Sequence, residues 1–538
     1  TKEIPVLPKA VEAMPQYLFP NRMVCGFGDT HPSTLRTDIF RYMIQNARTH
    51  GKSEDERKFT AMLKLFDPSS SLPVAERGKA PVAITSFFAG KPLVLDEKVK
   101  AGKIDDYVTP TFYAPNVSWL VQRNGMNPRH SLMVSLNGSE GNHMHANGIS
   151  MELYGKGYVL GPDAGIGKTL YQGLDYLEYY SQFPSHNTVC VDGISSYPVM
   201  KSNHSFKLRA LYPAAGEQIP YQPISYSEVY FREPETFADQ TRLNGIVNVG
   251  DSAGYYIDIF RSRKVEGGDK MHDYFYHNLG QHMTLTAADG SELGLQLTQE
   301  LAFAGGHLYA YSYIYNKKRA VTSKNVKAGF TIQMPDQDDI TMNLWMKGEE
   351  GREVFSALSP MTEGLSRIKD MPYSIKDQPT LTFVARQKGE AWNRPFVAVY
   401  EPSTVNEPSC ISSVDYPQVE SEQKGSHVGI RVVLTNGNID WILSSDEKTH
   451  HCALEKLQAC AGYALCRQSA EGETLQVFLG NGTQLETKGV SIRTDLPANV
   501  LLLKQNGKWM YTATAPCRVI VGKKKYTLSV ANVLTVLK

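Results

Sequence analysis

Several features that mark particular protein classes are scarce in this sequence of 538 residues. Its 56 Lys and Arg nearly balance 55 Asp and Glu, so the formal net charge of +1 provides no global basic field to hold nucleic acid. The seven cysteines are odd in number and lack Cys-x-x-Cys spacing, which argues against a thiolate zinc knuckle and a full disulfide framework. No apolar run approaches the roughly 18 residues that a membrane-spanning helix needs, so we expect no membrane span.

The cysteines and the first residues of the chain bear on the cellular compartment of the protein. Cys452, Cys460 and Cys466 lie near enough in sequence for one bridge, although buried free thiols are the interpretation we prefer. The first residues, TKEIPVLPKA, contain neither an initiating Met nor the apolar core of a signal peptide. We therefore expect a processed or truncated start. A secreted or periplasmic parent protein is compatible with such a start.

The apolar content is sufficient for large folded cores. Hydrophobic residues make up 41% and charged residues 21% of the chain, which excludes disorder as the main state. At about 100–200 residues per domain, a chain of this length predicts roughly two to four domains.

Two amphipathic helices are predicted near the N-terminus. Residues 53–66 open with a capping-box pattern of Ser53 and Glu56. Four apolar residues occur after it at helical spacing: Phe59, Met62, Leu63 and Phe66. A similar stripe runs through residues 35–50 and stops at Gly51. Two or three helices are too few to enclose a hydrophobic core of their own. They therefore either pack onto the later part of the chain or form the end of a larger helical domain.

The remaining sequence is typical of β-structure. Residues 76–120 are irregular and rich in Pro, Lys and Asp, which indicates a connecting segment. Beyond them, apolar runs of strand length alternate with Gly, Asn and Asp turns, and this pattern predicts stacked antiparallel sheets. A Pro-, Glu- and Ser-rich stretch over residues 401–425 suggests a boundary near residue 400.

The expected fold is therefore mainly β with N-terminal α-structure. We predict the end of a helical domain over residues 1–75 and a connecting segment over residues 76–120. A large antiparallel β-sandwich is expected over residues 121–400, and a smaller C-terminal β domain over residues 401–538.

Chemistry-bearing side chains are densest within residues 138–193. His143 and His145 are two apart, so on an extended strand both side chains leave from one face. Asp163 comes after a Gly-Lys-Gly turn and a return strand that bring it level with His145, and His186 opens HNTVCVDG. Imidazole and carboxylate are usual non-thiolate zinc ligands, so the set predicts a zinc-type site with an open position. The competing interpretation is that each histidine bonds a neighbouring backbone group.

The motifs of residues 141–193 also occur in a particular order. An H-x-H segment lies in HMHANGISMELYGKGYVLGPDAG, which ends in a D-x-G motif, and SHNTVCVDG comes next. This order resembles the central β-sandwich of the heparinase II/III-like polysaccharide lyases. The resemblance extends in architecture over about residues 1–400. It implies that residues 1–75 are the last helices of an α/α toroid.

The resemblance implies a reaction and roles for individual residues. The reaction is β-elimination on a uronic-acid polysaccharide, which needs a neutralised carboxylate, a base and an acid. His143 is similar to the sandwich histidine that faces the substrate. His145, Asp163 and His186 resemble the ligands of a zinc ion, or another divalent metal, with a structural role. Asn147 stands where many family members have Asp.

Other residues are weaker candidates for substrate contacts. The loop before His186 offers aromatic rings that would stack on sugars or pack at a sandwich edge; these are Tyr171, Tyr176 and Tyr180. Arg123 would pair with a uronate carboxylate or serve as a plain surface charge. His31 and Asp29 would line the cleft from the helical side, although a turn before a capped helix explains Asp29 equally well.

The resemblance further implies catalytic groups outside this chain. In the family an Asn or His and a Tyr lie on earlier toroid helices, so we expect these helices in the same parent chain or in a second polypeptide. Without them, residues 1–538 should bind oligouronates weakly and cleave them barely or not at all.

Two other function classes stay open beside a lyase. One is a non-catalytic carbohydrate-binding β-protein, and the other is a metal-dependent hydrolase, since a His-Asp-His site with an open position can activate water. For a lyase the partner is an acidic polysaccharide. The near-neutral charge favours a weakly sulfated or non-sulfated polymer such as alginate over heparin or heparan sulfate, whose dense sulfates demand many Lys and Arg.

Overall fold

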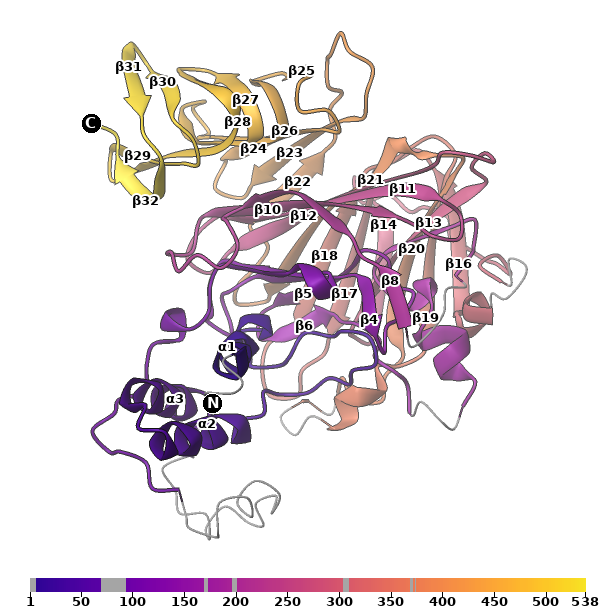
Figure 1. The fold of residues 1–538 in the computed structure, drawn as a ribbon. Helices are drawn as coiled ribbons and strands as arrows, with labels where there is room; N and C mark the ends of the chain where they lie inside the picture. The colour runs from indigo at the N-terminus through magenta and orange to yellow at the C-terminus, as the bar shows by residue number, and fades with distance from the viewer. Residues whose placement is uncertain are drawn as a thin grey trace.

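The computed structural model describes residues 6–68, 93–168, 173–195, 201–302, 309–367, 371–372 and 374–538. Figure 1 shows N-terminal helices at the lower left, β-sheets in the centre and a C-terminal sheet above them. The mainly β architecture with a few N-terminal helices confirms the predicted fold class. The predicted boundary near residue 75 lies outside the described residues.

The N-terminal helices are α1 (Val6–Ala13), α2 (Asp38–Thr49) and α3 (Ser53–Phe66). The bounds of α3 are those predicted, and its apolar stripe is buried in a small helical core that includes Phe40 and Ile44 of α2. The predicted capping box is wrong, because Lys52 and not Ser53 occupies the N-cap. The Glu56 carboxylate instead accepts a hydrogen bond from Arg48 Nε of α2 at 2.5 Å, so it joins the two helices.

The helical segment packs on a five-stranded antiparallel sheet through aromatic side chains. In spatial order this sheet contains β1 (Thr111–Ala114), β2 (Trp119–Arg123), β3 (Met133–Asn137), β5 (Ser150–Gly155) and β6 (Tyr158–Gly161). The Trp119 ring of β2 stacks on Tyr17 and Phe27, with ring centroids 4.7 and 4.6 Å apart. These stacks fix the N-terminal segment to the sheet that carries the candidate site.

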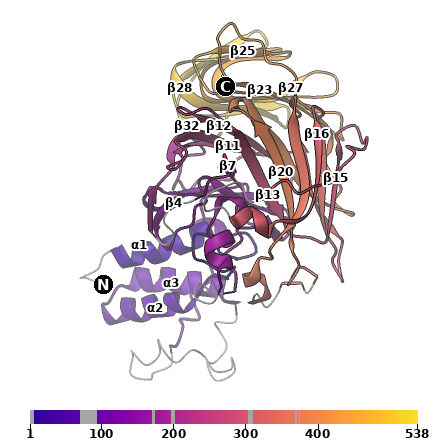
Figure 2. The same cartoon turned by 90° about the vertical axis from the view of Figure 1, so that its right-hand side faces the viewer.

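Two larger antiparallel sheets form the central sandwich. The eight-stranded sheet runs β14 (His282–Ala287), β17 (Val326–Ile332), β18 (Ile340–Met346), β21 (Ala391–Thr404), β12 (Gly254–Lys264), β11 (Ala238–Asn248), β10 (Ile224–Arg232) and β9 (Lys207–Tyr212). The six-stranded sheet runs β15 (Gln296–Leu297), β16 (Tyr315–Thr322), β19 (Arg352–Ser359), β20 (Thr380–Lys388), β13 (Met271–Asn278) and β7 (Val189–Val191). Tyr276 of β13 reaches across to Tyr400 and Phe330 of the eight-stranded sheet, at ring-centroid distances of 4.7 and 5.4 Å. In Figure 2 the helices and the six-stranded sheet lie on opposite sides of the molecule.

Short elements connect these sheets. A two-stranded sheet pairs β4 (Ser139–Asn142) with β8 (Lys201–His204). The turns are η1 (Met14–Tyr17), η5 (Ile104–Asp106), η6 (Pro115–Val117), η7 (Tyr176–Tyr180), η8 (Phe183–Ser185), η9 (Tyr309–Tyr313) and η10 (Glu363–Arg367). Of these, η7 is a single π-helical turn, a geometry that often occurs at functional sites.

The C-terminal sheet packs one face on the eight-stranded sheet. Its strands are β22 (Ile411–Asp415), β23 (His427–Leu434), β24 (Ile439–Ser445), β25 (His451–Leu454), β26 (Leu457–Gln468), β27 (Thr474–Thr487), β28 (Val490–Gln505), β29 (Lys508–Ala513), β30 (Cys517–Val521), β31 (Lys524–Leu528) and β32 (Ala531–Val536). Tyr226 of β10 stacks on Tyr463 of β26 at 5.1 Å, within an apolar cluster shared by both sheets. A second apolar cluster lies within the C-terminal sheet itself.

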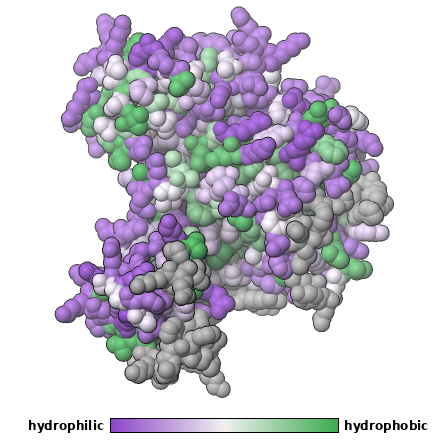
Figure 3. Space-filling view, in the orientation of Figure 1, coloured by the Kyte–Doolittle hydropathy of each residue, from purple (hydrophilic) through white to green (hydrophobic). Residues whose placement is uncertain are grey.

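The structure shows the state of the cysteines, the length of the helices and the character of the surface. All seven cysteines are free thiols, five of them buried, so the bridge allowed among Cys452, Cys460 and Cys466 is not formed. Among the helices that the structure describes, none is both long and apolar enough to span a bilayer. The visible surface in Figure 3 is largely hydrophilic, and exposed apolar side chains gather in the recess between the C-terminal sheet and the N-terminal helices.

One buried ion pair connects the eight-stranded sheet to the chemistry-bearing segments. The Arg242 guanidinium of β11 donates to both carboxylate oxygens of Asp258, at 2.8 and 2.7 Å. Arg242 is 0% exposed and Asp258 is 1% exposed. Its remaining nitrogen donates to the carbonyl oxygens of Ile149 and Asn187, at 2.7 and 2.6 Å. These carbonyls lie just beyond the H-x-H segment and just beyond His186, so one cation supports both histidine-bearing segments.

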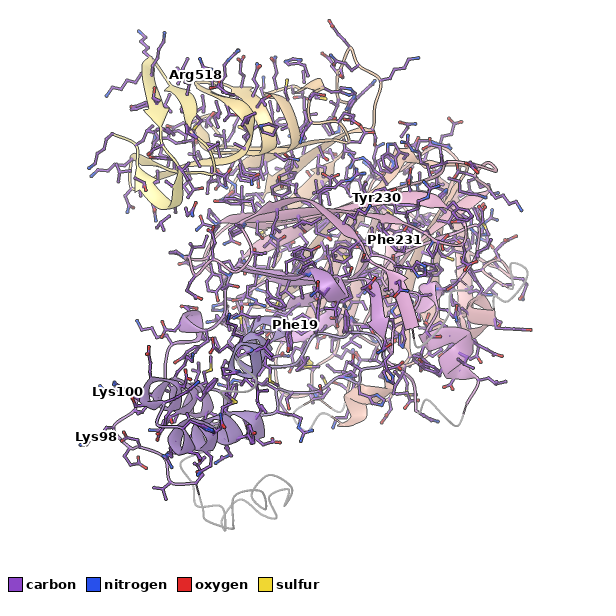
Figure 4. All side chains as sticks on the ribbon, in the orientation of Figure 1. Phe19, Lys98, Lys100, Tyr230, Phe231 and Arg518 are labelled. Carbon is purple, nitrogen blue, oxygen red and sulfur yellow. The ribbon has the colours of Figure 1, made fainter. Side chains whose placement is uncertain are left out.

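The replacement Arg242→Met should therefore destabilise the fold strongly, because it leaves the Asp258 charge buried without its cation. We expect the free energy of unfolding, measured by urea titration, to fall by about 3–5 kcal/mol. Arg518 of β30 is the matched control. It lies at the surface (Figure 4) and pairs with Asp495, so Arg518→Ala should cost less than about 1 kcal/mol. Equal losses in the two variants would contradict this account.

Candidate active site and metal centre

The H-x-H segment is a loop and not the extended strand that its sequence predicts. β4 ends at Asn142, and His143 adopts a left-handed backbone conformation with φ of 60°. The same-face argument for His143 and His145 is therefore wrong, because it assumes a pleated backbone. The two rings nevertheless converge on one carboxylate, that of Asp29 in the N-terminal segment.

Asp29 is the centre of the site. Its carboxylate accepts hydrogen bonds from His143 Nδ1 at 2.8 Å, from His145 Nε2 at 3.0 Å and from the Tyr176 hydroxyl at 2.5 Å. Burial raises the pKa of Asp29, but the hydrogen bonds from these three donors outweigh it and hold the pKa below its ordinary value. Asp29 is therefore an ionised acceptor at neutral pH.

An ionised carboxylate fixes the tautomer of each histidine that it binds. A carboxylate without a proton can only accept, so His143 carries hydrogen on Nδ1 and His145 carries it on Nε2. In the neutral rings, the lone pairs are then on Nε2 of His143 and Nδ1 of His145. The His143 side chain is 60% exposed and that of His145 is fully buried, so one lone pair belongs to a surface ring and the other to a buried ring.

The two loops can approach this closely because residue 28 is glycine. The Asp29 backbone N–H donates to the His143 carbonyl at 2.8 Å. A Cβ atom on Gly28 would lie 2.1 Å from that same carbonyl oxygen, and Gly28 has a φ of 54°. Both the contact and the backbone conformation therefore require glycine here.

The structure brings together the three predicted metal ligands, His145, Asp163 and His186. One ligand atom from each lies within 4.8 Å of the others, and all three residues are buried. Asp163 reaches this position because β5 and β6 form the expected hairpin, whose turn residues Lys156 and Gly157 have positive φ values. His186 Nδ1 lies 3.0 Å from an oxygen of Asp163.

The donor chemistry of this group fits a metal ion. Among the described residues, His145 Nδ1 and His186 Nε2 are buried without a hydrogen-bond partner. Burial lowers the pKa of His145, which keeps it in the neutral form that binds metals. Burial raises the pKa of Asp163, but the neighbouring His186 and His145 outweigh this effect and hold the pKa below its ordinary value. The carboxylate is therefore ionised. Two imidazoles and a carboxylate with unsatisfied nitrogen atoms suit zinc.

Glu152 is a third carboxyl group of the site, and the sequence did not predict it. Its oxygens accept hydrogen bonds from the backbone N–H groups of Asp163 at 3.2 Å and Gly26 at 2.8 Å. Burial, together with the charge of Asp163, raises the pKa of Glu152 to about 8. Glu152 thus links the loop that carries Asp29 to the metal-ligand candidate Asp163. The available signal was a lone acidic residue inside the apolar strand GISMELYG.

Two of the tyrosines predicted to contact the substrate are buried. Tyr176 and Tyr180 are each 2% exposed, so neither presents a ring face on which a sugar can stack. The Tyr180 hydroxyl donates to the Met361 carbonyl at 2.8 Å, and Tyr176 acts instead on Asp29. Tyr171 lies outside the described residues.

Arg123 and His31 differ in their placement. Arg123 is 1% exposed, and its guanidinium donates to the carbonyls of Thr109 and Gln16, so its predicted contact with a uronate is wrong. Its sequence position gave no sign of burial, which depends on how the N-terminal segment covers β2. His31 is half-buried two residues beyond Asp29, and its contact with a substrate stays a prediction.

Comparison with known proteins confirms the predicted relationship to polysaccharide lyases. Residues 1–71 match the family model described as the second domain of endo-acting ulvan lyase. Over 517 residues the chain is 26% identical to an endo-acting ulvan lyase of Formosa agariphila, and the alignment covers 89% of this chain. The chain spans 60% of the length of that relative.

Solved structures of lower sequence identity are also similar to the chain. A heparinase III gene product is 12% identical with a TM-score of 0.44, covering 78% of this chain and 49% of that one. The heparan sulfate lyase HepC of Pedobacter heparinus is 12% identical with a TM-score of 0.42, covering 80% of this chain and 52% of that one.

The replacement Tyr176→Phe tests whether the hydroxyl of Tyr176 stabilises the buried Asp29 carboxylate. Removing this donor should lower the free energy of unfolding by about 1.5–3 kcal/mol, since hydrogen bonds to charged groups contribute this much. Tyr315 is 43% exposed and serves as the control: Tyr315→Phe should change the stability by no more than about 0.5 kcal/mol. A Tyr176→Phe variant as stable as the parent would show that Asp29 does not depend on this donor.

Proposed function

We propose that this chain forms part of a polysaccharide lyase that cleaves a uronic-acid polymer by β-elimination, with His143 as its reactive side chain. The observation that carries the proposal is the exposed His143 ring, whose Nδ1 is held by the buried carboxylate of Asp29. A histidine held in this way has a fixed tautomer and a free outer nitrogen, as a general base requires.

In the proposed reaction, His143 Nε2 takes the proton from the carbon next to the uronate carboxylate. The electron pair of the broken C–H bond forms a carbon–carbon double bond, and the bond from the neighbouring carbon to the glycosidic oxygen breaks. Asp29 keeps the ring oriented and stabilises the imidazolium that forms. The proton for the leaving oxygen comes from a group on the opposite side of the sugar, which we assign to the further toroid helices expected in the parent protein or a second polypeptide.

We assign a structural zinc ion, or another divalent metal, to His145, Asp163 and His186. Bound there, the ion would join the H-x-H loop, the end of β6 and the segment before β7. His145 would then hold the ion through Nδ1 while its Nε2–H continues to orient Asp29, the arrangement typical of metal-bound histidines. The burial of all three ligands disfavours a hydrolase in which the metal must meet the substrate.

The similarity to the ulvan lyase of Formosa agariphila favours ulvan as the substrate over alginate, which the charge of the chain alone favours. Heparan sulfate remains the second polymer to test. Because such polymers are too large to enter a cell intact, we also propose that the protein is secreted or periplasmic.

Replacement of His143 by Ala in the full-length protein should reduce turnover by about 100-fold or more, because a positioned base contributes this much. The measurement is the ultraviolet absorbance of the unsaturated uronate released from ulvan, alginate and heparan sulfate. His282 on β14 is also exposed, so His282→Ala is the matched control and should keep normal activity. Normal turnover in His143→Ala would rule out the assignment, and product without the absorbance change would indicate hydrolysis.

The zinc assignment is tested by elemental analysis of the purified protein. The replacement His186→Ala should remove about one equivalent of metal and lower the thermal unfolding temperature, because metal bound to the native state stabilises it. Adding a chelator should lower the unfolding temperature of the parent, because it removes this ion. The His186→Ala variant already lacks the ion, so its unfolding temperature should fall less. An unchanged metal content in His186→Ala would contradict the assignment.

A further inference from the structure

A second group of histidine and carboxylate side chains lies where the C-terminal sheet meets the eight-stranded sheet. His427 begins β23, Asp446 comes directly after β24 and His450 precedes β25. One ligand atom from each lies within 4.8 Å of the others, and all three residues are half-buried. The group is therefore accessible from solution, unlike the buried group of His145, Asp163 and His186.

The hydrogen bonds of His427 leave its Nδ1 lone pair available. Nε2 lies 3.1 Å from the Gln423 carbonyl, which can only accept, so Nε2 carries the hydrogen of the neutral ring. The Ser445 hydroxyl lies 3.1 Å from Nδ1, but its single hydrogen is donated to the Glu447 carbonyl at 2.9 Å. The remaining neighbour of Nδ1 is the thiol of Cys452 at 3.4 Å, which is a weak donor. A metal ion would be a far better partner for this lone pair.

The Asp446 carboxylate is oriented from two directions. Trp392 Nε1 of β21 donates to Oδ2 at 2.7 Å, and the Ser426 backbone N–H donates to Oδ1 at 2.9 Å. The Trp392 ring is held in turn by the guanidinium of Arg263, whose centre lies 4.1 Å from the ring centroid. Hydrogen bonds that orient a carboxylate in this way are typical of the partners surrounding a metal ligand.

His450 and Gly425 complete the arrangement. Within the described part of the chain, His450 Nδ1 is buried without a hydrogen-bond partner. A Cβ atom on Gly425 would lie 2.9 Å from Asp446 Oδ1, 2.9 Å from His427 Cε1 and 3.1 Å from His450 Nδ1. The three side chains therefore converge on the space that the absent side chain of Gly425 leaves open.

We propose that His427, Asp446 and His450 form a second metal site, which takes a divalent transition-metal ion of the zinc type. Two imidazoles and one carboxylate are ligands that zinc prefers, and the exposed side leaves room for water as a further ligand. Because Asp446 is hydrogen-bonded to Trp392 of the eight-stranded sheet, an ion bound here would stabilise the junction between that sheet and the C-terminal sheet. This inference does not depend on the lyase proposal.

The experiment strips the full chain of metal with a chelator, titrates it with Zn²⁺ alone and counts bound zinc by elemental analysis. Whatever the parent binds, His450→Ala should bind about one equivalent less, because two remaining ligands hold zinc weakly. If the site of His145 and His186 also binds zinc, the parent binds about two equivalents; if it does not, about one. The zinc content of the parent and of His450→Ala therefore shows separately whether each of the two sites binds zinc.

Two further variants keep the test decisive. The exposed neighbour His451 is the matched control, and His451→Ala should bind as much zinc as the parent. Gly425→Ala keeps every ligand but places a methyl group in the space between them, so it should lose the same equivalent as His450→Ala. The unfolding temperature of each variant in chelator is its own reference, and zinc should raise the temperature above this reference less in His450→Ala and Gly425→Ala than in the parent. A full zinc content in both of these variants would overturn the proposal.

Discussion

The buried pair of Arg242 and Asp258 is the interaction on which the candidate site depends most. Its guanidinium is neutralised within the eight-stranded sheet and still has a nitrogen left to hold the carbonyls of Ile149 and Asn187. A buried cation with an ionised partner and its N–H groups satisfied is rigid, because any movement would leave a charge or a carbonyl unpaired. The loops with His145 and His186 are therefore held by the sandwich although neither histidine lies in a strand of it.

The N-terminal segment is an integral part of this site and not only a neighbour of it. It supplies Asp29, which is the common acceptor for His143, His145 and Tyr176. Because one carboxylate binds Nδ1 of one histidine and Nε2 of the other, the two rings have their lone pairs on different nitrogens. The same ionised group therefore sets both tautomers, and these suit the proton transfer that we propose for the surface ring and the metal binding that we propose for the buried ring.

The sequence predicted what depends on local pattern or residue type. The apolar spacing of Phe59 to Phe66 predicted the helix α3, and the Gly-Lys-Gly turn predicted the β5–β6 hairpin that precedes Asp163. Contacts that join distant segments could not be predicted in this way. Nothing local indicates that Arg123 is buried or that Asp29 receives three hydrogen bonds, since both depend on how the N-terminal segment packs on the sheets. The left-handed backbone conformation of His143 was not predicted either.

The charges around His143 decide how an acidic polymer would meet this surface. A bare Asp29 carboxylate would repel a uronate, but its charge is spread over three donors and its side chain is only 4% exposed. A metal ion on His145, Asp163 and His186 would add positive charge beneath the same loop and reduce the repulsion further. Arg123 cannot neutralise the uronate carboxylate, because it is buried against backbone carbonyls. In the proposed reaction, a group other than Arg123 must therefore neutralise this carboxylate while His143 takes the proton.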